Sequence, residues 1–434
     1  MSSGGTAPGN PHVVHFLPGL AQNIAPFELQ KALVIQLATF PLGTSSGGFT
    51  YTLDPATGAI APASRSFGPS FAERPLTIGK GKVTTGIQYQ HVEFDAFEGA
   101  DLDGEEITFA LPHNNCCPGG ANNPTAPGNT LPFFEGDLVE IRPSLKAKTD
   151  TTVVFANYGV TNDLEVGVAV PFVRASLNVE GRSTIVRLST AAQPTIHSFD
   201  GTGSTEAVIP SIGGSATGVG DVLVRAKYLF LRRPDSGVAG EVGVRLPTGD
   251  ESDLLGTGGT QTRLLFIAGM SRGDFAPHVN LGYVLSTGKV SSAVTDLEVP
   301  AGSAGDPIRN LTVADIDLSV PDEFHYTAGF DWAVSPRVTV AADVIGRVIR
   351  NVTRFDISNS TFQFRTADTG PILTDSRPTF NLDGTRNLNL LLGAVGAKFN
   401  VATNLLLTAN VLFPLSDSGL KPKVTPVIGL DYAF

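Results

Sequence analysis

The stretch Leu164-Glu-Val-Gly-Val-Ala-Val-Pro-Phe172 carries an apolar residue at every second position. Successive side chains of a β-strand point to opposite faces, so this period of two predicts a strand with one apolar face and one mixed face. The same alternation returns at residues 222–230, 242–246, 275–285 and 324–332. The sequence therefore predicts a succession of β-strands that each have one apolar face and one mixed face.

About twelve runs of this kind are predicted from the alternation. They span residues 81–97, 138–158, 163–181, 217–232, 238–248, 259–271, 274–289, 322–334, 337–351, 387–399, 403–414 and 421–434. Most are roughly 11–18 residues long, whereas the commonest strand length in soluble proteins is about 5–6 residues. A tilted strand that crosses a bilayer needs about 9–11 residues within the lipid and can extend beyond it. The lengths therefore favour membrane-spanning strands.

The connections between these runs alternate in length. The short ones are rich in turn residues and span 159–163, 233–237, 272–273, 335–336 and 400–402. The others are mostly long and span 98–137, 182–216, 249–258, 290–321 and 352–386, with only 415–420 tight. Short turns at one rim and long loops at the other predict an all-β transmembrane protein, an antiparallel up-and-down barrel of about twelve (12–14) strands. The alternative is a large soluble β-protein with its apolar faces turned inward.

A sheet that crosses a membrane must close on itself, because lipid cannot hydrogen-bond the free groups of a sheet edge. Charged residues of the parity opposite to the apolar face are then expected inside, because an Arg or Lys facing lipid at mid-depth costs about 2–4 kcal/mol. The residues expected to line the lumen are Glu165, Arg225, Lys227, Glu241, Arg245, Arg263, Asp331, Asp343 and Arg347. We expect Arg245 to pair with Glu165 or Glu241 and to hold the interior together.

Composition argues against several classes of protein. Hydrophobic residues make up 41% of the 434 residues, which argues against disorder. No stretch offers the ~18 consecutive apolar residues of a membrane-spanning helix. The net charge of −11 has the wrong sign for a nucleic-acid binder.

No common catalytic or nucleotide-binding motif occurs among the residues, so we expect no enzyme, no catalytic residue and no cofactor. A barrel-embedded hydrolase is the enzyme alternative. It would need a Ser beside a His, and His278 and His325 are both predicted to point inward.

Residues 1–80 do not follow the barrel pattern and are predicted to form a separate N-terminal segment, with the barrel over residues 81–434. Apolar residues at helical spacing predict a short helix near residues 27–40. Residues 49–60 predict a small hairpin. A segment that starts at the short-turn rim could fold into the lumen as a plug. A periplasmic flap, or a disordered leader over the first ~25 residues, is the alternative.

The N-terminus as given shows no secretory signal peptide, because no Lys or Arg precedes Lys31. Three explanations stay open: the sequence is a mature chain given a start Met, its start is misassigned, or the chain is not exported. The adjacent Cys116 and Cys117 lack the spacer of a zinc motif, so we expect a vicinal pair in a surface loop, joined or not, and no metal site. Acidic residues at 98–106 and 250–253 are expected to be solvated, with divalent-ion bridging to lipopolysaccharide as the alternative.

Three segments resemble those of a known family. They are Tyr158-Gly-Val-Thr-Asn-Asp-Leu-Glu-Val-Gly167, Gly218-Val-Gly-Asp221 and Leu246-Pro-Thr-Gly-Asp-Glu251. In order and spacing they resemble the outer-membrane proteins associated with phenol meta-cleavage pathways, over roughly residues 140–434. That group is similar in plan to the long-chain fatty-acid and aromatic-hydrocarbon transporters of outer membranes, which carry an N-terminal hatch inside the barrel. The final Tyr432-Ala-Phe434 resembles the end signature that the barrel-assembly machinery recognises.

The resemblance implies passive uptake of small hydrophobic or aromatic solutes through a porin-like barrel in the bacterial outer membrane, and it implies no defined binding residue. The expected partners are the bilayer, lipopolysaccharide, the assembly machinery and the solutes themselves. A structural or adhesive barrel that displays long surface loops without transport is the alternative.

Overall fold

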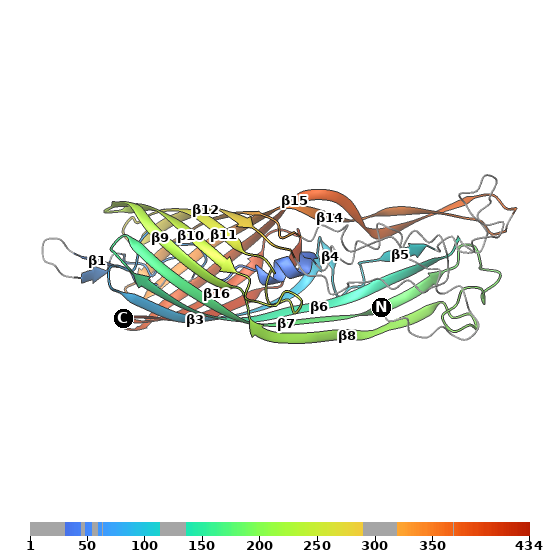
Figure 1. The fold of residues 1–434 in the computed structure, drawn as a ribbon, viewed down its shortest axis with the longest axis horizontal. Helices are drawn as coiled ribbons and strands as arrows, with labels where there is room; N and C mark the ends of the chain where they lie inside the picture. Colours follow the sequence, from blue (N-terminus) through green and yellow to red (C-terminus); the bar gives the residue numbers. More distant parts are fainter. Residues whose placement is uncertain are drawn as a thin grey trace.

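The computed structural model describes residues 31–44, 48–53, 60–62, 64–112, 136–289, 319–367 and 369–434. Within this part of the chain, twelve antiparallel strands form a closed barrel (Figure 1). They are β3 (Val83–Phe97), β6 (Leu138–Gly159), β7 (Leu164–Val186), β9 (Val222–Arg233), β10 (Ser236–Leu246), β11 (Gln261–Met270), β12 (Phe275–Ser286), β13 (Glu323–Ser335), β14 (Val338–Phe364), β15 (Leu373–Ala402), β16 (Leu405–Pro414) and β18 (Thr425–Ala433). Each lies over one predicted run, so the predicted transmembrane up-and-down barrel is confirmed.

The barrel closes between its first and last strands. β18 pairs with β3 in antiparallel register, for example Leu430 with Ile87, and β3 pairs on its other side with β6. The backbone N–H of Phe434 donates to the carbonyl of Val83 at 2.9 Å, which fixes the C-terminus beside the start of β3. Every strand of the barrel therefore has two neighbours, as a sheet surrounded by lipid requires.

The apolar parity faces outward around the barrel. On β10, Val242 is 48% exposed, and its register partners Ala226 and Leu264 lie on the same outer face. The row continues through Tyr283 on β12 and Phe324 on β13. In a soluble protein these side chains would be buried, so their exposure is explained by contact with acyl chains. No helix in the described ranges is long and apolar enough to cross a membrane.

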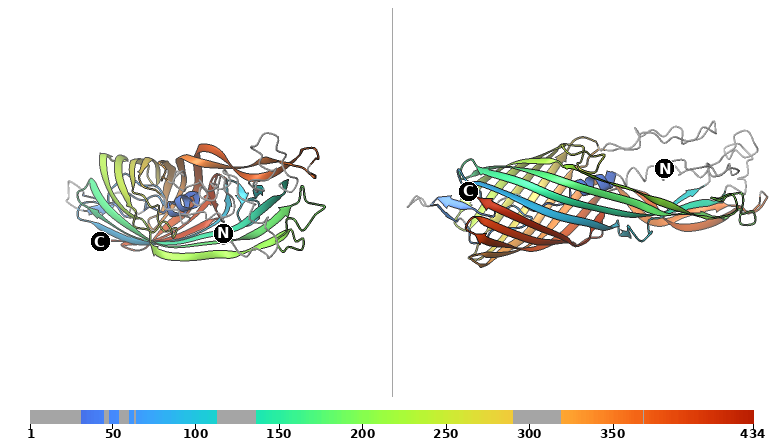
Figure 2. Two further views of the ribbon diagram at one scale, coloured as in Figure 1. Left: turned by 45° about the vertical axis from the view of Figure 1, so that its right-hand side comes forward. Right: turned by 90° about the horizontal axis from the view of Figure 1, so that it is seen from below.

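Two parts of the sheet continue beyond the long-loop rim (Figure 2). β8 (Glu206–Val219) pairs with the second half of β7, and β5 (Phe109–Pro112) pairs with the start of β6. β14 and β15 stay paired as far as Phe364 and Leu373. The prediction of loops over 182–216 and 352–386 is therefore wrong in large part. Residues 356–361 contain a single apolar side chain, Ile357, so these strands lack the alternation that marks the membrane-spanning part.

A buried network of polar groups fixes one loop of this extension. Asp137, directly before β6, accepts hydrogen bonds from the backbone N–H of Ser189 at 2.7 Å, from the Thr190 hydroxyl and from His197 Nδ1 at 2.7 Å. Asp137, Thr190 and His197 are fully buried. Burial by itself raises the pKa of Asp137, but the hydrogen bonds from His197, Thr190 and Ser189 outweigh it and hold that pKa below its ordinary value.

Replacing this carboxylate, as Asp137→Asn, is expected to release residues 187–198. A buried hydrogen bond to a charged group is worth about 1.5–3 kcal/mol, so the open loop should become roughly tenfold more populated. In the wild type the guanidinium of Arg187 donates to the carbonyls of His197 and Gly203. Opening of the loop frees this side chain, so the rate of tryptic cleavage after Arg187 measures the opening.

Glu206→Gln, at an exposed residue that starts β8, is the matched control and should leave the cleavage rate unchanged. Because the pKa of Asp137 is lowered in the folded protein, its contribution is present above the ordinary carboxyl pKa and lost as pH falls through the folded value. The protection of residues 188–198 against hydrogen exchange, corrected for the intrinsic exchange rate at each pH, should therefore fall in acid. Protection that does not change with pH in the wild type would contradict this role of Asp137.

The described residues 31–44 and 64–78 lie against the inner face of the barrel, whereas residues 51–53 project beyond its short-turn rim (Figure 1). Residues 31–38 are helical, within the range predicted for a helix, and residues up to 30 lie outside the described part. β1 (Tyr51–Leu53) and β2 (Ile60–Pro62) form the predicted hairpin, which is confirmed. Two further short strands, β4 (Ala100–Asp101) and β17 (Leu420–Pro422), pair with the end of β3 at the long-loop rim.

Candidate transport pathway

The inner face of the wall carries charge along hydrogen-bonded rows. The register pairs Glu165 with Lys227 and Lys227 with Glu241, on β7, β9 and β10. The row then continues through Leu265, Gly282, His325 and Arg347. A second row is displaced by two residues along each strand, and it carries Arg225, Arg263 and Glu323. These charges come from different strands and meet because neighbouring strands pair in this register.

All nine charged residues singled out in the sequence lie on this inner face. Seven are buried: Glu165, Arg225, Lys227, Glu241, Asp331, Asp343 and Arg347. Arg245 and Arg263 are half-buried.

One cluster is built around Arg225 and is referred to below as the Arg225 cluster. The guanidinium of Arg225 lies 3.3 Å from Glu73, 3.1 Å from Glu165 and 2.9 Å from Glu241, measured between the nearest N and O atoms. Lys227 lies 3.7 Å from Glu165 and 3.8 Å from Glu73, and Arg263 lies 2.5 Å from Glu241. The cluster joins wall strands to residue 73, which precedes the barrel. Such a pairing compensates the desolvation of buried charges, which would otherwise cost several kcal/mol per ion.

A glycine makes room for this cluster. Gly167 faces inward on β7, opposite Asn157 and Arg225. A Cβ at position 167 would collide with Asn157 Oδ1, the atom that accepts a 2.7 Å hydrogen bond from Arg225. The inward glycine therefore allows the guanidinium to reach β6 across β7.

The expected pairing of Arg245 is wrong. Its guanidinium donates instead to the carbonyl of Ala38, at 3.3 Å, and Arg225 holds both Glu165 and Glu241. Parity alone placed both arginines inside, but the stagger between strands decides which of them reaches the carboxylates.

A second cluster lies at the end of the helical residues. Arg347 on β14 binds Glu323 on β13 at 2.8 Å and donates to the Thr39 hydroxyl at 2.5 Å. His325 Nε2 lies 2.7 Å from the same Glu323 carboxylate. Gln36 accepts from the backbone N–H of Leu420 at 2.6 Å. The helical residues are therefore held to the wall on two sides.

A third cluster is centred on His278. Its Nε2 lies 2.6 Å from Asp343 and its Nδ1 lies 3.4 Å from Asp331. Both imidazole nitrogens of His278 thus face carboxylates. Nε2 of His325 also faces a carboxylate, that of Glu323. Neither histidine has the serine partner that the hydrolase alternative requires among its described ion pairs and hydrogen bonds.

Residues 67–78 have no regular secondary structure, and polar side chains of the wall bind their peptide groups. The carbonyl of Pro69 accepts from Lys398 at 2.6 Å, and the N–H of Phe71 donates to Asp343 at 3.0 Å. Asn280 binds both backbone groups of Glu73, the N–H at 2.6 Å and the carbonyl at 2.9 Å. Further contacts come from Thr339 to Phe67, from Lys227 to the carbonyl of Arg74 and from Glu165 to the N–H of Ile78. A buried backbone must be hydrogen-bonded, so the polar inner face is what allows this segment to lie inside.

Several of these residues were not predicted. Asn280, Glu323 and Lys398 have the inward parity, so a rule that counted every polar inward residue would have found them. Glu73 and Arg74 are harder to find, because no periodic pattern covers residues 64–81. Their signal is local: the adjacent charges Glu73 and Arg74 in a stretch otherwise rich in Gly, Pro, Ser and Phe.

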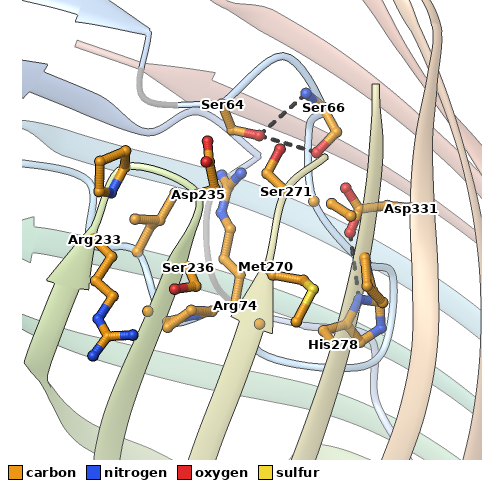
Figure 3. Close-up of a pocket in the computed structure, with 18 of the residues that line it drawn as sticks. Ser64, Ser66, Arg74, Arg233, Asp235, Ser236, Met270, Ser271, His278 and Asp331 are labelled. Carbon is orange, nitrogen blue, oxygen red and sulfur yellow. Dashed lines mark hydrogen bonds and ion pairs between the residues drawn. The ribbon is translucent and has the colours of Figure 1, made fainter. Parts of the chain in front are cut away.

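Two cavities lie on either side of Glu73 and Arg74. The larger, of about 420 Å³, is at the short-turn rim and is lined by Arg74, Pro75, Met270, His278 and Asp331 among others (Figure 3). The smaller, of about 150 Å³, is lined by Thr39, Phe40, Glu73, Asn280 and Arg347 among others. Glu73 lines the smaller cavity and Arg74 lines the larger, so the peptide that joins these two residues lies between the cavities.

A family model matches residues 120–348, more than half of the chain. The family is described as "Putative MetA-pathway of phenol degradation". The chain belongs to this family. The range that matches the phenol MetA-pathway family includes Glu165, Arg225 and Glu241 of the wall. It begins after Glu73, the residue of the inner chain that Arg225 binds. No curated protein matches the chain.

Several solved outer-membrane barrels are similar to this family member in fold. An outer-membrane channel from Pseudomonas putida F1 is 12% identical, with 84% of this chain and 99% of the other covered and a TM-score of 0.45. A Pseudomonas aeruginosa FadL homologue is 12% identical, with 90% and 96% covered and a TM-score of 0.33. The CymD monoaromatic hydrocarbon channel is 11% identical, with 83% and 91% covered and a TM-score of 0.32.

The C-terminal aromatic residues of this family member lie on the outer face at the short-turn rim. Tyr432 and Phe434 form an edge-to-face pair with ring centroids 4.7 Å apart. Their role as an assembly signal stays a prediction. Cys116 and Cys117 lie outside the described residues, as does residue 113 beside them. Within the described ranges, no group of three His, Cys, Asp or Glu side chains is arranged to hold a metal ion.

Proposed function

We propose that this chain is a channel of the bacterial outer membrane that lets small apolar or aromatic solutes cross passively, with residues 1–80 acting as a lumenal plug. One observation carries the proposal. Residues 67–78 run through the barrel without secondary structure, and their peptide groups are bound by side chains of the wall. A segment held in this way can be displaced without breaking any strand pairing of the barrel.

The proposed route has three parts. A solute partitions into the long-loop side, reaches the cavity beside Thr39 and Phe40, and passes Glu73 into the cavity at the short-turn rim. The side chains of the Arg225 cluster hold the plug in place and need not contact the solute. No bond is made or broken in the solute, and its concentration difference supplies the driving force.

Two observations support apolar solutes: the apolar residues that line the larger cavity and the description of the family. Pro75, Leu76, Met270 and Pro277 contribute apolar surface to the larger cavity. The family description refers to phenol degradation, and one similar barrel is described as a monoaromatic hydrocarbon channel. The lipid bilayer is then the partner of the outer face, and lipopolysaccharide and the barrel-assembly machinery are proposed partners at the long loops and the C-terminus.

Solute uptake by liposomes tests the proposal. The full chain should accelerate uptake of a small apolar probe over protein-free liposomes. Deleting residues 1–45 removes the helical residues and the Thr39 contact to Arg347 but retains Glu73 and the Arg225 cluster, so uptake should rise further. Glu206→Gln, at an exposed residue, is the control and should transport like the wild type.

A heat-modifiable gel shift shows that each variant is folded before uptake is measured. Uptake equal to that of protein-free liposomes for both the full chain and the deletion variant would overturn the channel proposal. That result would favour a structural barrel that displays its long loops.

A further inference from the structure

The larger cavity has features of a binding site that passive passage does not require. The cavity lies at the short-turn rim. On one side of it are residues 64–76, called the inner segment below, and on the other are the turns that join β9 to β10 and β11 to β12. Its volume of about 420 Å³ falls within the range of small-molecule pockets. Figure 3 shows Asp331, His278 and Arg74 around this space together with the hydroxyl groups of Ser64, Ser66 and Ser271.

Asp331 brings an unused hydrogen-bond acceptor to this cavity. Its side chain is inward-facing on β13, and the residue is only 3% exposed. Oδ1 faces His278 Nδ1 at 3.4 Å, whereas Oδ2 is buried and accepts no hydrogen bond from any described residue. A buried polar atom without a partner is costly, so a ligand that donates one hydrogen bond to Oδ2 is favoured.

The charges around the cavity select the kind of donor. Arg74, Arg232, Arg233 and His278 line the same space as Asp331 and would repel an ammonium group. A carboxylate or phosphate anion would place a further acceptor against Asp331 Oδ2 and cannot donate the missing hydrogen bond. A neutral hydroxyl group avoids both penalties, because it donates one hydrogen bond and carries no charge into a poorly solvated site.

The remaining wall fits an apolar body. Pro75 and Leu76 cover one side, and Met270 and Pro277 cover another. Arg65 and Asp274 form an exposed ion pair of 3.1 Å between the inner segment and the β11–β12 turn. Exposed pairs of this kind contribute about 1 kcal/mol or less, so this pair does not seal the site.

We propose that this cavity binds a small apolar molecule with a single hydroxyl group, which donates a hydrogen bond to Asp331 Oδ2. The inference deepens the proposed function, because the site would be the last one that a solute occupies before it leaves the short-turn rim. Binding at this site is measured without any flux, so the two proposals can fail separately.

Calorimetric titration of the full chain in detergent micelles tests the site with two matched probes. Benzyl alcohol has the hydroxyl donor, and benzyl methyl ether keeps the ring but cannot donate. The heat of each probe with protein-free micelles is subtracted. The wild type should bind the alcohol at least about tenfold more tightly than the ether, the discrimination expected when one buried acceptor gains or lacks its donor.

Two variants locate the site. Asp331→Leu removes the acceptor and should reduce the alcohol-to-ether ratio to about one, by weakening the binding of the alcohol. Met270→Trp narrows the cavity without touching an ion pair and should weaken both probes. Asp417→Leu is the control, because Asp417 is an exposed carboxylate that pairs with Lys421 at the opposite rim and does not line the cavity, and it should preserve the ratio.

Each outcome decides the question. An unchanged ratio in Asp331→Leu, equal binding of the two probes to the wild type, or unchanged affinity in Met270→Trp would overturn the proposed site. If Asp331→Leu does not fold, Met270→Trp and the comparison of the two probes still decide. Flux without binding would support the channel and overturn the binding site. Binding without flux would support the site and overturn the channel.

Discussion

The variant Arg225→Met is expected to lower the free energy of unfolding by about 3–5 kcal/mol, because it leaves the buried carboxylates of Glu73 and Glu165 without their nearest cation, whereas Glu241 keeps Arg263. Arg225 is almost fully buried and contacts Glu73, Glu165 and Glu241 within 3.3 Å. Lys227 lies no closer than 3.7 Å to any of these carboxylates and cannot replace it. Urea-induced unfolding in lipid vesicles, followed by the heat-modifiable gel shift, measures the change.

Arg232→Met is the matched control for this prediction. Arg232 lies on the same strand, β9, and pairs with Asp163 at 3.0 Å, but both side chains are at least 34% exposed. Exposed pairs contribute about 1 kcal/mol or less, so this variant should be nearly as stable as the wild type. The double variant Arg225→Met with Glu165→Gln should recover part of the loss, because it removes one of the unpaired charges. Equal stability of the two single variants would contradict the role given to Arg225.

The variant Val242→Arg is expected to destabilise the barrel in lipid by about 2–4 kcal/mol, because it turns a cation toward acyl chains near mid-depth. Val242 lies in the middle part of β10 on the outer face, between Ala226 and Leu264. Substituting a residue that is 48% exposed to water would change stability by only about 0.5 kcal/mol. The same vesicle assay therefore separates a membrane barrel from a soluble one.

Val401→Arg is the control for depth. Val401 is 54% exposed and lies at the end of β15, beside the turn to β16. A cation near the membrane interface costs about 0–1 kcal/mol, so this variant should differ little from the wild type. A small effect of Val242→Arg would place the outer face in water and would remove the basis of the channel proposal.

The candidate pathway was only partly accessible from the sequence. Inward parity predicted Glu165, Arg225 and Asp331, because the direction of a side chain depends only on its place in its own strand. The partners of these residues did not follow. Glu73 is 152 residues from Arg225, and the pairing of Arg245 was predicted wrongly for the same reason. The sheet extensions were missed because they lie beyond the apolar band and lack its alternation.

The amino-acid pattern alone was enough to predict a barrel, the positions of its membrane-spanning strands and the inward direction of their charged side chains. These properties depend on a two-residue period and on alternating connection lengths, which are local features of the chain. The contacts among the buried charges, the path of residues 67–78 through the lumen and the cavity beside Asp331 became visible only in the folded molecule. Those features depend on the stagger and closure of the whole sheet, which join residues from opposite ends of the chain and leave no periodic trace in it.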